Sequence, residues 1–343
     1  GQESSGIATT DGRQCYLYKS KGNVHDVFNQ DEIIDKYLKG DTAIGHNRYS
    51  TTGGNAIENI QPLLINFKKG SLAIAHNGNL TNTRSLQREM ENTGSIFQTS
   101  MDSEVILHLI ARSQCSSLPE MIIDALQKIQ GAFSLIFMTP DCMIAARDPF
   151  GFRPLSIGKL DESVVIASES CAFDIINAEF IRDVEPGEVI VIEKDSIKSH
   201  FPFTRRTSQH CVFEYIYFAR PDSLVFGEYV DVVRRRLGRQ LAIDHPAEAD
   251  IVMSVPDSSN SAALGYAQEL GIPFEFGLIR NHYVGRTFIH PTQTKREFGV
   301  KIKFNPLVPV LKGKRVVMVD DSIVRGTTSK KIIRMVKEAG AQE

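Results

Sequence analysis

The most informative stretch of the chain is VVMVDDSIVRGTTS at residues 316–329. Four apolar residues predict a buried strand, which ends in the paired carboxylates of Asp320 and Asp321. The glycine, threonines and serine that follow would open a helix and offer backbone N–H groups to an anion. Paired acids accept hydrogen bonds from vicinal hydroxyls and can stabilise positive charge at an anomeric carbon. The stretch therefore predicts a sugar-phosphate site at the carboxyl end of a strand.

Strands alternate with helices before this stretch. Helical periodicity runs through residues 230–243 and 261–270, and an apolar strand at 251–255 lies between them. A further helix is expected at residues 329–339. This alternation predicts a parallel α/β sheet with helices on both faces. The GxGxxG and GK[ST] patterns of dinucleotide and P-loop sites are absent, so the anion site is of another kind.

Residues 1–200 follow a different pattern of short strands, turns and a few helices. Strands are expected at residues 72–75, 132–139, 164–168 and 188–193, and helices at 103–111 and 118–129. The composition turns polar at residues 203–210. We therefore expect two domains, 1–205 and 206–343, which suits a length of 343 residues.

The bulk composition is that of a globular protein, with 42% hydrophobic and 23% charged residues. A net charge of −2 gives no indication of a nucleic-acid partner, and no apolar run is long enough to cross a bilayer. The five cysteines are scattered and odd in number, which favours reduced thiols in a cytoplasmic protein. Because the chain opens on Gly1 rather than methionine, an organellar transit peptide before it stays an alternative.

Four short motifs follow one another in the first half of the chain. They read GQESSGIA at residues 1–8, GHNRYSTTG at 45–53, HNGNL at 76–80 and DSE at 102–104. Each alone has a simple structural interpretation. Asn77-Gly78 is a hairpin turn signal. Asp102 can cap the next helix, and Arg48 can be a surface charge.

Together and in this order, the motifs resemble the class II glutaminase domain, an N-terminal-nucleophile fold of two stacked sheets between helices (αββα). The resemblance implies that Arg48 pairs with the α-carboxylate of glutamine and Asp102 with its α-ammonium. It implies that Asn77 and Gly78 form the oxyanion hole, through a side-chain amide and a backbone N–H.

The nucleophile of that domain is a cysteine at the mature N-terminus, whose α-amino group serves as the general base. Nothing in this chain matches it, since Cys15 has no free α-amine and lies beyond the first motif. We therefore expect a chain that is truncated at its start and that does not hydrolyse glutamine by itself. Truncation is expected at the other end too, because only one helix follows residues 316–329.

Residues 316–329 resemble the binding motif for phosphoribosyl pyrophosphate (PRPP) in type I phosphoribosyltransferases. The resemblance implies a parallel α/β sheet in which Asp320 and Asp321 bind the ribose hydroxyls. It assigns the 5-phosphate to Arg325, Gly326, Thr327, Thr328 and Ser329. Residues 254–259, SVPDSS, resemble the pyrophosphate loop of that family through Asp257 and Ser258, although a helix cap fits them as well.

Residues 280–289, RNHYVGRTFI, resemble the flexible loop that closes over PRPP in amidophosphoribosyltransferases. Tyr283 and Arg286 are the candidates there, since a planar guanidinium matches phosphate oxygens. Members of that family often carry Lys at Arg280 and Arg at His282, and both departures leave a candidate cation.

The order of the two halves resembles the amidophosphoribosyltransferase family over nearly the whole chain. Residues 211–223, CVFEYIYFARPDS, resemble the start of its transferase half, although the aromatic run also fits a buried strand. The resemblance implies that ammonia from glutamine displaces pyrophosphate from PRPP to give 5-phosphoribosylamine, the first committed step of de novo purine synthesis. A salvage phosphoribosyltransferase with an unrelated first domain, or a non-enzymatic PRPP or nucleotide sensor, would account for only one half.

The resemblance also implies cofactors and partners. Mg²⁺ would bridge ribose and pyrophosphate at Ser258, Asp320 and Asp321. Some members carry a [4Fe–4S] cluster on four thiolates, and Cys211 stands where one ligand would be, but cluster-free relatives also have a cysteine there. Purine nucleotides are expected as feedback inhibitors and a homodimer or homotetramer as the assembly, with no nucleic acid and no membrane. The basic run at residues 234–236 predicts a solvated helix face, with a phosphate contact as the alternative.

Overall fold

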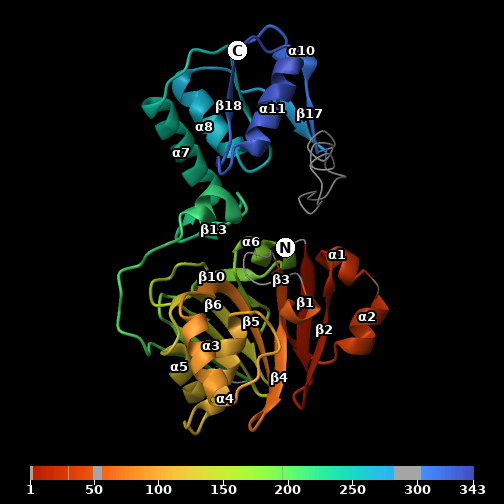
Figure 1. Ribbon diagram of the computed structural model, residues 1–343, viewed down its shortest axis with the longest axis vertical. Coiled ribbons are helices and arrows are strands. Elements are labelled where there is room, and N and C mark those ends of the chain that lie inside the picture. The colour runs from red at the N-terminus through yellow and green to blue at the C-terminus, as the bar shows by residue number, and fades with distance from the viewer. Residues whose placement is uncertain (1–2, 30, 49–55, 195, 282–302) are drawn as a thin grey trace. The chain divides into compact units, whose positions relative to one another are not determined.

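The computed structural model describes residues 3–29, 31–48, 56–194, 196–281 and 303–343. The chain forms two compact units (Figure 1). Unit 1 comprises residues 1–168 and 172–211, and unit 2 comprises residues 169–171 and 212–343. By compactness the chain thus divides between Cys211 and Val212, whereas a domain boundary after residue 205 remains a prediction.

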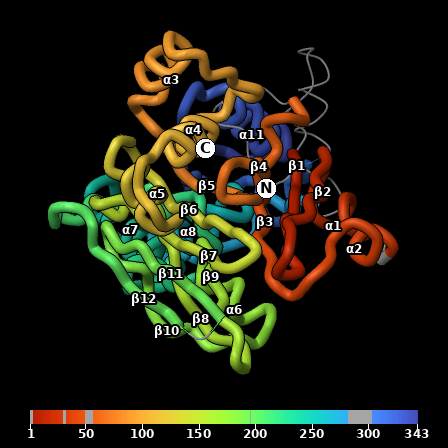
Figure 2. The backbone as a smooth tube through the Cα atoms, turned by 90° about the horizontal axis from the view of Figure 1, so that it is seen from below, coloured from red at the N-terminus to blue at the C-terminus, as the bar shows by residue number. Residues whose placement is uncertain are grey.

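Unit 1 is built mainly from antiparallel strands. The strands are β1 (Ser4–Thr10), β2 (Cys15–Lys21), β3 (Thr42–Arg48), β4 (Leu63–Phe67), β5 (Gly70–Leu80), β6 (Gly131–Met138), β7 (Cys142–Arg147), β8 (Ser156–Leu160), β9 (Ser163–Ala167), β10 (Glu179–Asp183), β11 (Val189–Glu193) and β12 (Ser196–His200). The helices are α1 (Val24–Val27), α2 (Asp31–Tyr37), α3 (Thr83–Asn92), α4 (Ser103–Arg112), α5 (Leu118–Leu126) and α6 (Cys171–Ile176), with a short 3-10 turn η1 (Ile57–Asn59). The strands form the sheets β2-β1-β3, β10-β8-β9 and β12-β11-β7-β6-β5-β4 (Figure 2).

The six-stranded sheet carries helices α3, α4 and α5 on one face, where the largest core of the unit forms (Figure 1). Ile74 of β5, Ile106 of α4, Ile122 of α5 and Leu135 of β6 are all 0% exposed. Burial of each such side chain contributes about 1.5–3 kcal/mol, so this interface dominates the stability of the unit.

The opposite face of the same sheet packs on the two smaller sheets. Ala73 and Ala75 of β5 alternate with the residues that face the helices, and they meet Ala8 of β1 and Ile44 of β3. Strands β7 and β11 meet β8 in the same way. Helix α2 packs outside β2, where Tyr18 stacks on Tyr37. The layers are therefore helix, sheet, sheet and helix, which confirms the predicted αββα fold.

Strand β5 runs through Asn77-Gly78 without turning. Its pairing with β6 is continuous there, with Asn77 opposite Ser134. The hairpin interpretation of this dipeptide is therefore wrong. A glycine is required for a different reason, because a Cβ on Gly78 would lie 2.1 Å from the carbonyl oxygen of Ala132 on β6.

Unit 2 alternates strands and helices, as the sequence predicts. Its elements are the π-helix η2 (Glu214–Phe218), β13 (Leu224–Val225), β14 (Glu228–Tyr229), α7 (Val230–Asp244), β15 (Ile251–Ser254), α8 (Asn260–Leu270), β16 (Leu278–Arg280), β17 (Phe304–Pro306), α10 (Val308–Leu311), β18 (Val316–Val319) and α11 (Thr327–Glu338).

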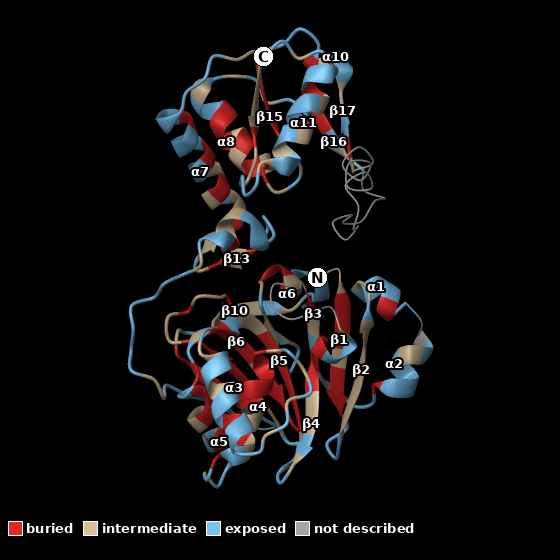
Figure 3. Cartoon of the chain, viewed as in Figure 1, coloured by how far each residue is buried: buried red, intermediate tan, exposed pale blue. Residues whose placement is uncertain are grey.

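The centre of unit 2 is a parallel pair, β15 and β18, with a further parallel bridge from Val252 to Phe274. Helices α7 and α8 cover one face around Val252 and Tyr266. Helices α10 and α11, with β16 and β17, cover the other face around Met253 and Ile332. Figure 3 marks the buried residues of α8, α11 and β15 between these layers. The predicted parallel α/β sheet covered on both faces is confirmed.

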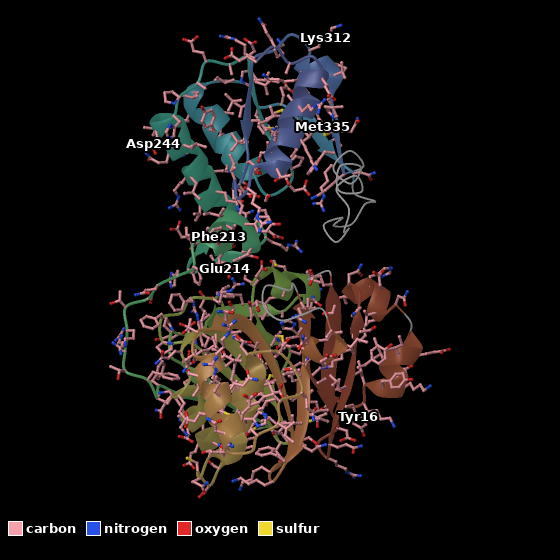
Figure 4. All side chains as sticks on the ribbon, in the orientation of Figure 1. Tyr16, Phe213, Glu214, Asp244, Lys312 and Met335 are labelled. Atoms are coloured by element: carbon pink, nitrogen blue, oxygen red, sulfur yellow. The ribbon has the colours of Figure 1, made fainter. Side chains whose placement is uncertain are left out.

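The aromatic run at residues 211–223 is not a buried strand. It contains the π-helix η2, in which Glu214 is buried, whereas Phe213 just before it is 48% exposed (Figure 4). Tyr215 faces inward, packs edge-on against Phe226 and donates its hydroxyl hydrogen to the carbonyl oxygen of Val225. One side of a helical turn is thus buried. A run of consecutive aromatic residues does not reveal whether the segment is such a turn or a buried strand.

Helices α7 and α8 cross closely because a glycine on each faces the backbone of the other. A Cβ on Gly238 would lie 1.8 Å from the carbonyl oxygen of Ala262, and one on Gly265 would lie 2.1 Å from that of Arg235. This crossing fixes α8, and with it residues 254–259 at its start.

Gly238→Ala is expected to weaken the packing of α7 on α8. The new methyl group meets backbone atoms that cannot rotate away, so separating the helices costs about 1–3 kcal/mol. Segment-resolved hydrogen exchange should show faster exchange of the α7 and α8 amides. Arg239→Ala, at the exposed neighbouring position, is the matched control and should change stability by less than about 0.5 kcal/mol. Equal exchange rates in the two variants would contradict the close crossing.

Candidate functional site

Strand β5 has an open edge along its second half, because β4 pairs only as far as Ile74. Along an antiparallel strand, successive N–H groups point to opposite edges. The N–H of His76 donates to Gln61 Oε1 at 2.7 Å, and the N–H of Leu80 donates to Asp102 Oδ2 at 2.9 Å. Both groups therefore point away from β6 and toward the open edge.

Gly78 lies midway between these two residues, so its N–H points to the same edge. Within the described residues, this N–H donates to no group at the open edge. The neighbouring Asn77 amide accepts a hydrogen bond through Oδ1 from Arg153 Nη2 at 3.1 Å. A guanidinium only donates, so the amide atom that contacts it must be the oxygen. The Asn77 amide therefore directs its Nδ2–H donors away from Arg153.

Asp102 stands just before α4 but does not cap it, since its side chain makes no capping hydrogen bond. The capping interpretation is therefore wrong. The carboxylate is 7% exposed and is bound by the N–H of Leu80, by Ser103 Oγ at 3.3 Å and by His76 Nδ1 at 3.4 Å. Burial would raise the pKa of Asp102, but these hydrogen bonds, that with His76 first, hold it below its ordinary value. Asp102 is thus a buried anion at neutral pH.

Arg48 is the last residue of β3 and is 3% exposed, so it is not a surface charge. Burial lowers the pKa of Arg48, and the charge of Glu3 partly offsets this, but the guanidinium stays charged at neutral pH. Its Nη1 donates to the carbonyl oxygen of Asn59 at 3.2 Å, and Asn59 Oδ1 accepts the N–H of Ser100 at 3.0 Å. Asn59 therefore links the cation to the loop that carries Asp102.

The loop before Asp102 is fixed by a second buried acid. Glu104 accepts the N–H groups of Gln98 at 2.8 Å and of Thr99 at 2.7 Å. A buried cation and a buried anion, each held by protein hydrogen bonds, suit the two charged ends of an amino acid. Two N–H donors on β5 suit the oxygen of an amide that is being cleaved.

In unit 2 the two acids after β18 meet the serines that follow β15. Ser258 Oγ donates to the carboxylate of Asp321, and Ser259 Oγ contacts Asp320 Oδ1 at 3.5 Å. The parallel strands end at the same edge of the sheet, which brings these side chains together. Ser259 makes no capping hydrogen bond to α8, so the segment is more than a helix cap.

Asp320 has a raised pKa, first because of burial and then because of the neighbouring charge on Asp321. A hydroxyl donor or a divalent cation would relieve this accumulation of negative charge. Gly326 follows with φ +66°, and α11 begins at Thr327. Arg325, Thr327 and Thr328 are exposed, so their donors and the first N–H groups of α11 remain accessible to an anion.

Arg234 is buried at 3% exposure, unlike the solvated helix face that its basic run predicts. Its guanidinium donates to the carbonyl oxygens of Tyr215 and Ala219 and so ties α7 to η2. Its neighbours form surface ion pairs instead, Arg235 with Asp231 and Arg236 with Glu228. The explanation is the helical repeat, since Arg234 lies on the same face as the buried Val230 and Gly238.

Several predicted residues are placed only in part. Asp257 is exposed and forms an ion pair with Arg280, which joins residues 254–259 to the start of the 280–289 segment. Tyr283 and Arg286 lie outside the described residues, as do positions 1–2 and 49–53 of the first-half motifs.

No group of three His, Cys, Asp or Glu side chains that could hold a metal ion occurs in the described part of the chain. Cys211 is a free, half-buried thiol. Burial raises the pKa of Cys15, Cys142 and Cys171, which keeps these thiols protonated and weakly nucleophilic. None of the described helices is both long enough and apolar enough to span a membrane.

Two family models match the chain. One, described as a glutamine amidotransferase domain, matches residues 46–174. The other, described as a phosphoribosyl transferase domain, matches residues 233–343.

The chain is 51% identical to the amidophosphoribosyltransferase of Rhizobium etli, over 100% of this chain and 70% of that protein. The chain belongs to the amidophosphoribosyltransferase family. It is also 50% identical to the chloroplastic amidophosphoribosyltransferase 1 of Arabidopsis thaliana, and it spans 61% of that protein's length. The predicted membership among glutamine-dependent glycosyltransferases of purine biosynthesis is thereby confirmed.

Solved structures of amidophosphoribosyltransferases have the same fold. An allosteric regulatory enzyme of purine biosynthesis matches 100% of this chain with a TM-score of 0.94 and 51% identity, over 74% of its own chain. The Bacillus subtilis enzyme in complex with ADP and GMP matches with a TM-score of 0.93 and 50% identity, over the same shares.

The sequence analysis missed several residues of the candidate site. Arg153 contacts an amide 76 positions away, and Asn59 contacts a loop 41 positions away. Gln61 binds the strand edge beside Gly78. Only the charged RDPFGFR run at residues 147–153, which begins at the last residue of β7, is a local sign of buried polar contacts.

Stability should depend on pH through His46, which lies on β3 with Nε2 3.1 Å from the carbonyl oxygen of His76. Burial lowers the pKa of His46 to about 4. Because the unfolded value is higher, near 6.5, protonation favours the unfolded state, and stability falls as the pH drops from about 6.5 toward 4.

His46→Gln, which keeps an N–H donor, should therefore lose about 2 kcal/mol less than the wild type between pH 7 and pH 5. Urea unfolding followed by circular dichroism at both pH values measures the difference. Identical losses in the two proteins would show that His46 does not titrate as a buried group.

Proposed function

We propose that the protein containing this chain makes 5-phosphoribosylamine, glutamate and pyrophosphate from glutamine, water and PRPP. The observation that carries the proposal is the presence, in one chain, of an outward N–H at Gly78, next to the fixed Asn77 amide, and of two paired acids at the end of β18. Family membership supports the same reaction. A salvage enzyme would need only the second site, and a sensor would need no oxyanion donors.

In the glutamine half, Arg48 binds the α-carboxylate and Asp102 the α-ammonium. Asn77 Nδ2 and the N–H of Gly78 donate to the oxygen of the side-chain amide as it becomes an oxyanion. The nucleophile is the N-terminal cysteine of the family, which lies outside this chain. Attack of its thiolate on the amide carbon gives a thioester and releases ammonia, and water then cleaves the thioester to glutamate.

In the PRPP half, Asp320 and Asp321 accept hydrogen bonds from the ribose hydroxyls. The 5-phosphate lies in the loop of Arg325, Gly326, Thr327, Thr328 and Ser329, at the N-terminus of α11. Asp257 and Ser258 face the pyrophosphate, and Tyr283 and Arg286 belong to the segment that closes over it. Ammonia forms the new bond to the anomeric carbon as the bond to the pyrophosphate oxygen breaks.

The acids fit Mg²⁺, because carboxylate and hydroxyl oxygens are its preferred ligands and one or two carboxylates suffice when substrate oxygens complete the shell. Ser258, Asp320 and Asp321 would hold it, and the raised pKa of Asp320 reflects a site that gains from a nearby cation. When bound, Mg²⁺ supplies neutralisation of the charge on the departing pyrophosphate.

Regulation and assembly follow the family. Purine nucleotides act as feedback inhibitors, in line with the Bacillus subtilis enzyme that binds ADP and GMP. The protein assembles as a homodimer or homotetramer and acts in the cytoplasm or, like its Arabidopsis relative, in a plastid. If it carries a [4Fe–4S] cluster, Cys211 is one ligand, and an iron and acid-labile sulfide assay on the full-length protein decides this.

The experiment follows pyrophosphate release by the full-length protein with PRPP and either glutamine or ammonia. Asn77→Ala should lower the glutamine-dependent rate by about 10²–10³-fold, since it removes one oxyanion donor, and should leave the ammonia-dependent rate unchanged. Asp321→Asn should lower both rates. Asn66→Ala, on the exposed face of β4, is the matched control and should change neither.

Two outcomes would overturn the proposal. If PRPP is consumed with neither donor, the transferase assignment fails. If Asn77→Ala lowers the glutamine-dependent and the ammonia-dependent rates equally, Asn77 does not act in glutamine cleavage and the glutaminase assignment fails.

A further inference from the structure

Arg153 is a half-buried cation that reaches the Asn77 amide, with Nη2 3.1 Å from Oδ1. We infer that Arg153 is a positioning residue of the oxyanion hole, which fixes the orientation of the Asn77 amide and strengthens its Nδ2–H donors. The inference rests on the proposed glutaminase function of unit 1.

The orientation of an amide is decided by its neighbours, because its oxygen and nitrogen are nearly equal in size. A guanidinium has no acceptor, so rotation of the Asn77 amide by 180° would turn two N–H groups against it. Without Arg153 that rotated state becomes accessible. In it Oδ1, rather than Nδ2, would face the developing oxyanion, and the interaction would become repulsive.

The charge of Arg153 acts in the same direction. A hydrogen bond from a cation to Oδ1 withdraws electron density from the amide, so the Nδ2–H groups become stronger donors. Coupled hydrogen bonds of this kind strengthen one another by roughly 10–30%. The positive charge also lies one amide away from the place where negative charge develops.

The loop that carries Arg153 is built to hold it still. Arg147, which is 2% exposed, donates to the carbonyl oxygens of Arg153 at 2.8 Å, Gly151 at 3.0 Å and Val184 at 2.6 Å. Ser134 Oγ donates to the same Arg153 oxygen at 3.3 Å. Ser134 lies on β6 directly opposite Asn77 of β5. Its bond to Arg153 therefore holds the loop close to the part of the sheet that carries Asn77.

A second buried group closes the loop. Asp148 is 0% exposed and accepts the N–H groups of Phe150 at 2.9 Å, Phe152 at 3.1 Å and Phe133 at 3.3 Å. A Cβ on Gly151 would lie 2.8 Å from Pro186 Cγ, so the turn is also tightly packed. Such a loop preorganises the Arg153 side chain, which it directs to Asn77 of β5.

The simpler interpretation is that Arg153 only joins the loop to β5. That role would make its loss a loss of stability, shared by every reaction of the protein. The proposed role affects only the step in which an oxyanion forms, and it acts only through Asn77. The two interpretations therefore differ in kinetics and in their dependence on Asn77.

The test compares Arg153→Met, Arg153→Lys, Asn77→Ala and the double variant R153M/N77A in the full-length protein. Arg153→Met should lower kcat for glutamine hydrolysis by about 100-fold, with little change in KM, because the oxyanion exists only in the transition state. Arg153→Lys, which keeps a cation and a donor, should recover part of that loss. Ammonia-dependent activity should be unchanged in all variants.

In the Asn77→Ala background, Arg153→Met should have an effect within about twofold, since its target is already gone. Arg112→Met, which removes a remote arginine that binds the end of α3, is the matched control for the loss of a guanidinium. Circular dichroism melting of each variant separates unfolding from a kinetic defect.

The outcomes separate a failure of the proposed glutaminase function from a failure of the role assigned to Arg153. If the wild-type protein hydrolyses no glutamine, the proposed function fails and this inference fails with it. The inference alone is overturned if the wild type is active but Arg153→Met keeps full kcat or raises only KM. It is also overturned if the fold-losses in kcat of Arg153→Met and Asn77→Ala multiply in the double variant.

Discussion

The candidate glutamine site depends on the early end of β4, which leaves the second half of β5 without a partner strand on one edge. Three N–H groups then point outward in series, and the protein binds the first and third, at His76 and Leu80. The middle one, at Gly78, keeps its direction because its neighbours are fixed. Strand alternation thus provides the oxyanion donor that we propose at Gly78 without any special loop. Asp102, which binds Leu80, lies at the same edge.

The second site depends on a comparable constraint, the common edge at which parallel strands end. Because β15 and β18 are neighbours, Ser258 and Asp321 meet although they are 63 positions apart. The close crossing of α7 and α8 at Gly238 keeps the serine loop at that edge. In both units, therefore, backbone geometry brings the functional groups together, and buried side chains such as Glu104 and Arg234 secure the backbone.

The parallel sheet of unit 2 was predictable from the sequence, because apolar periodicity indicates which face of an element is buried. The αββα fold of unit 1 followed from the resemblance of its four motifs to a known domain. The strand at residues 316–319 was predicted to the residue. The predictions were wrong where the same short sequence is compatible with two local structures. Asn77-Gly78 favours a turn unless a partner strand holds it extended, as β6 does, and the aromatic run around Tyr215 forms a π-helix. Arg153 and Asn59 were not predictable, because their roles arise from contacts between segments that are distant in the sequence.

Asn-Gly is the dipeptide in which asparagine is most prone to deamidate spontaneously, because the glycine nitrogen can attack the side-chain carbonyl carbon. That attack needs a bent backbone and a freely rotating amide. At Asn77 the chain is extended in β5, and Arg153 holds the amide oxygen. Deamidation would place a carboxylate in the proposed oxyanion hole. The strand geometry therefore also controls how fast Asn77 deamidates. Deamidation is slow while β5 stays paired with β6 and becomes fast once that pairing is lost.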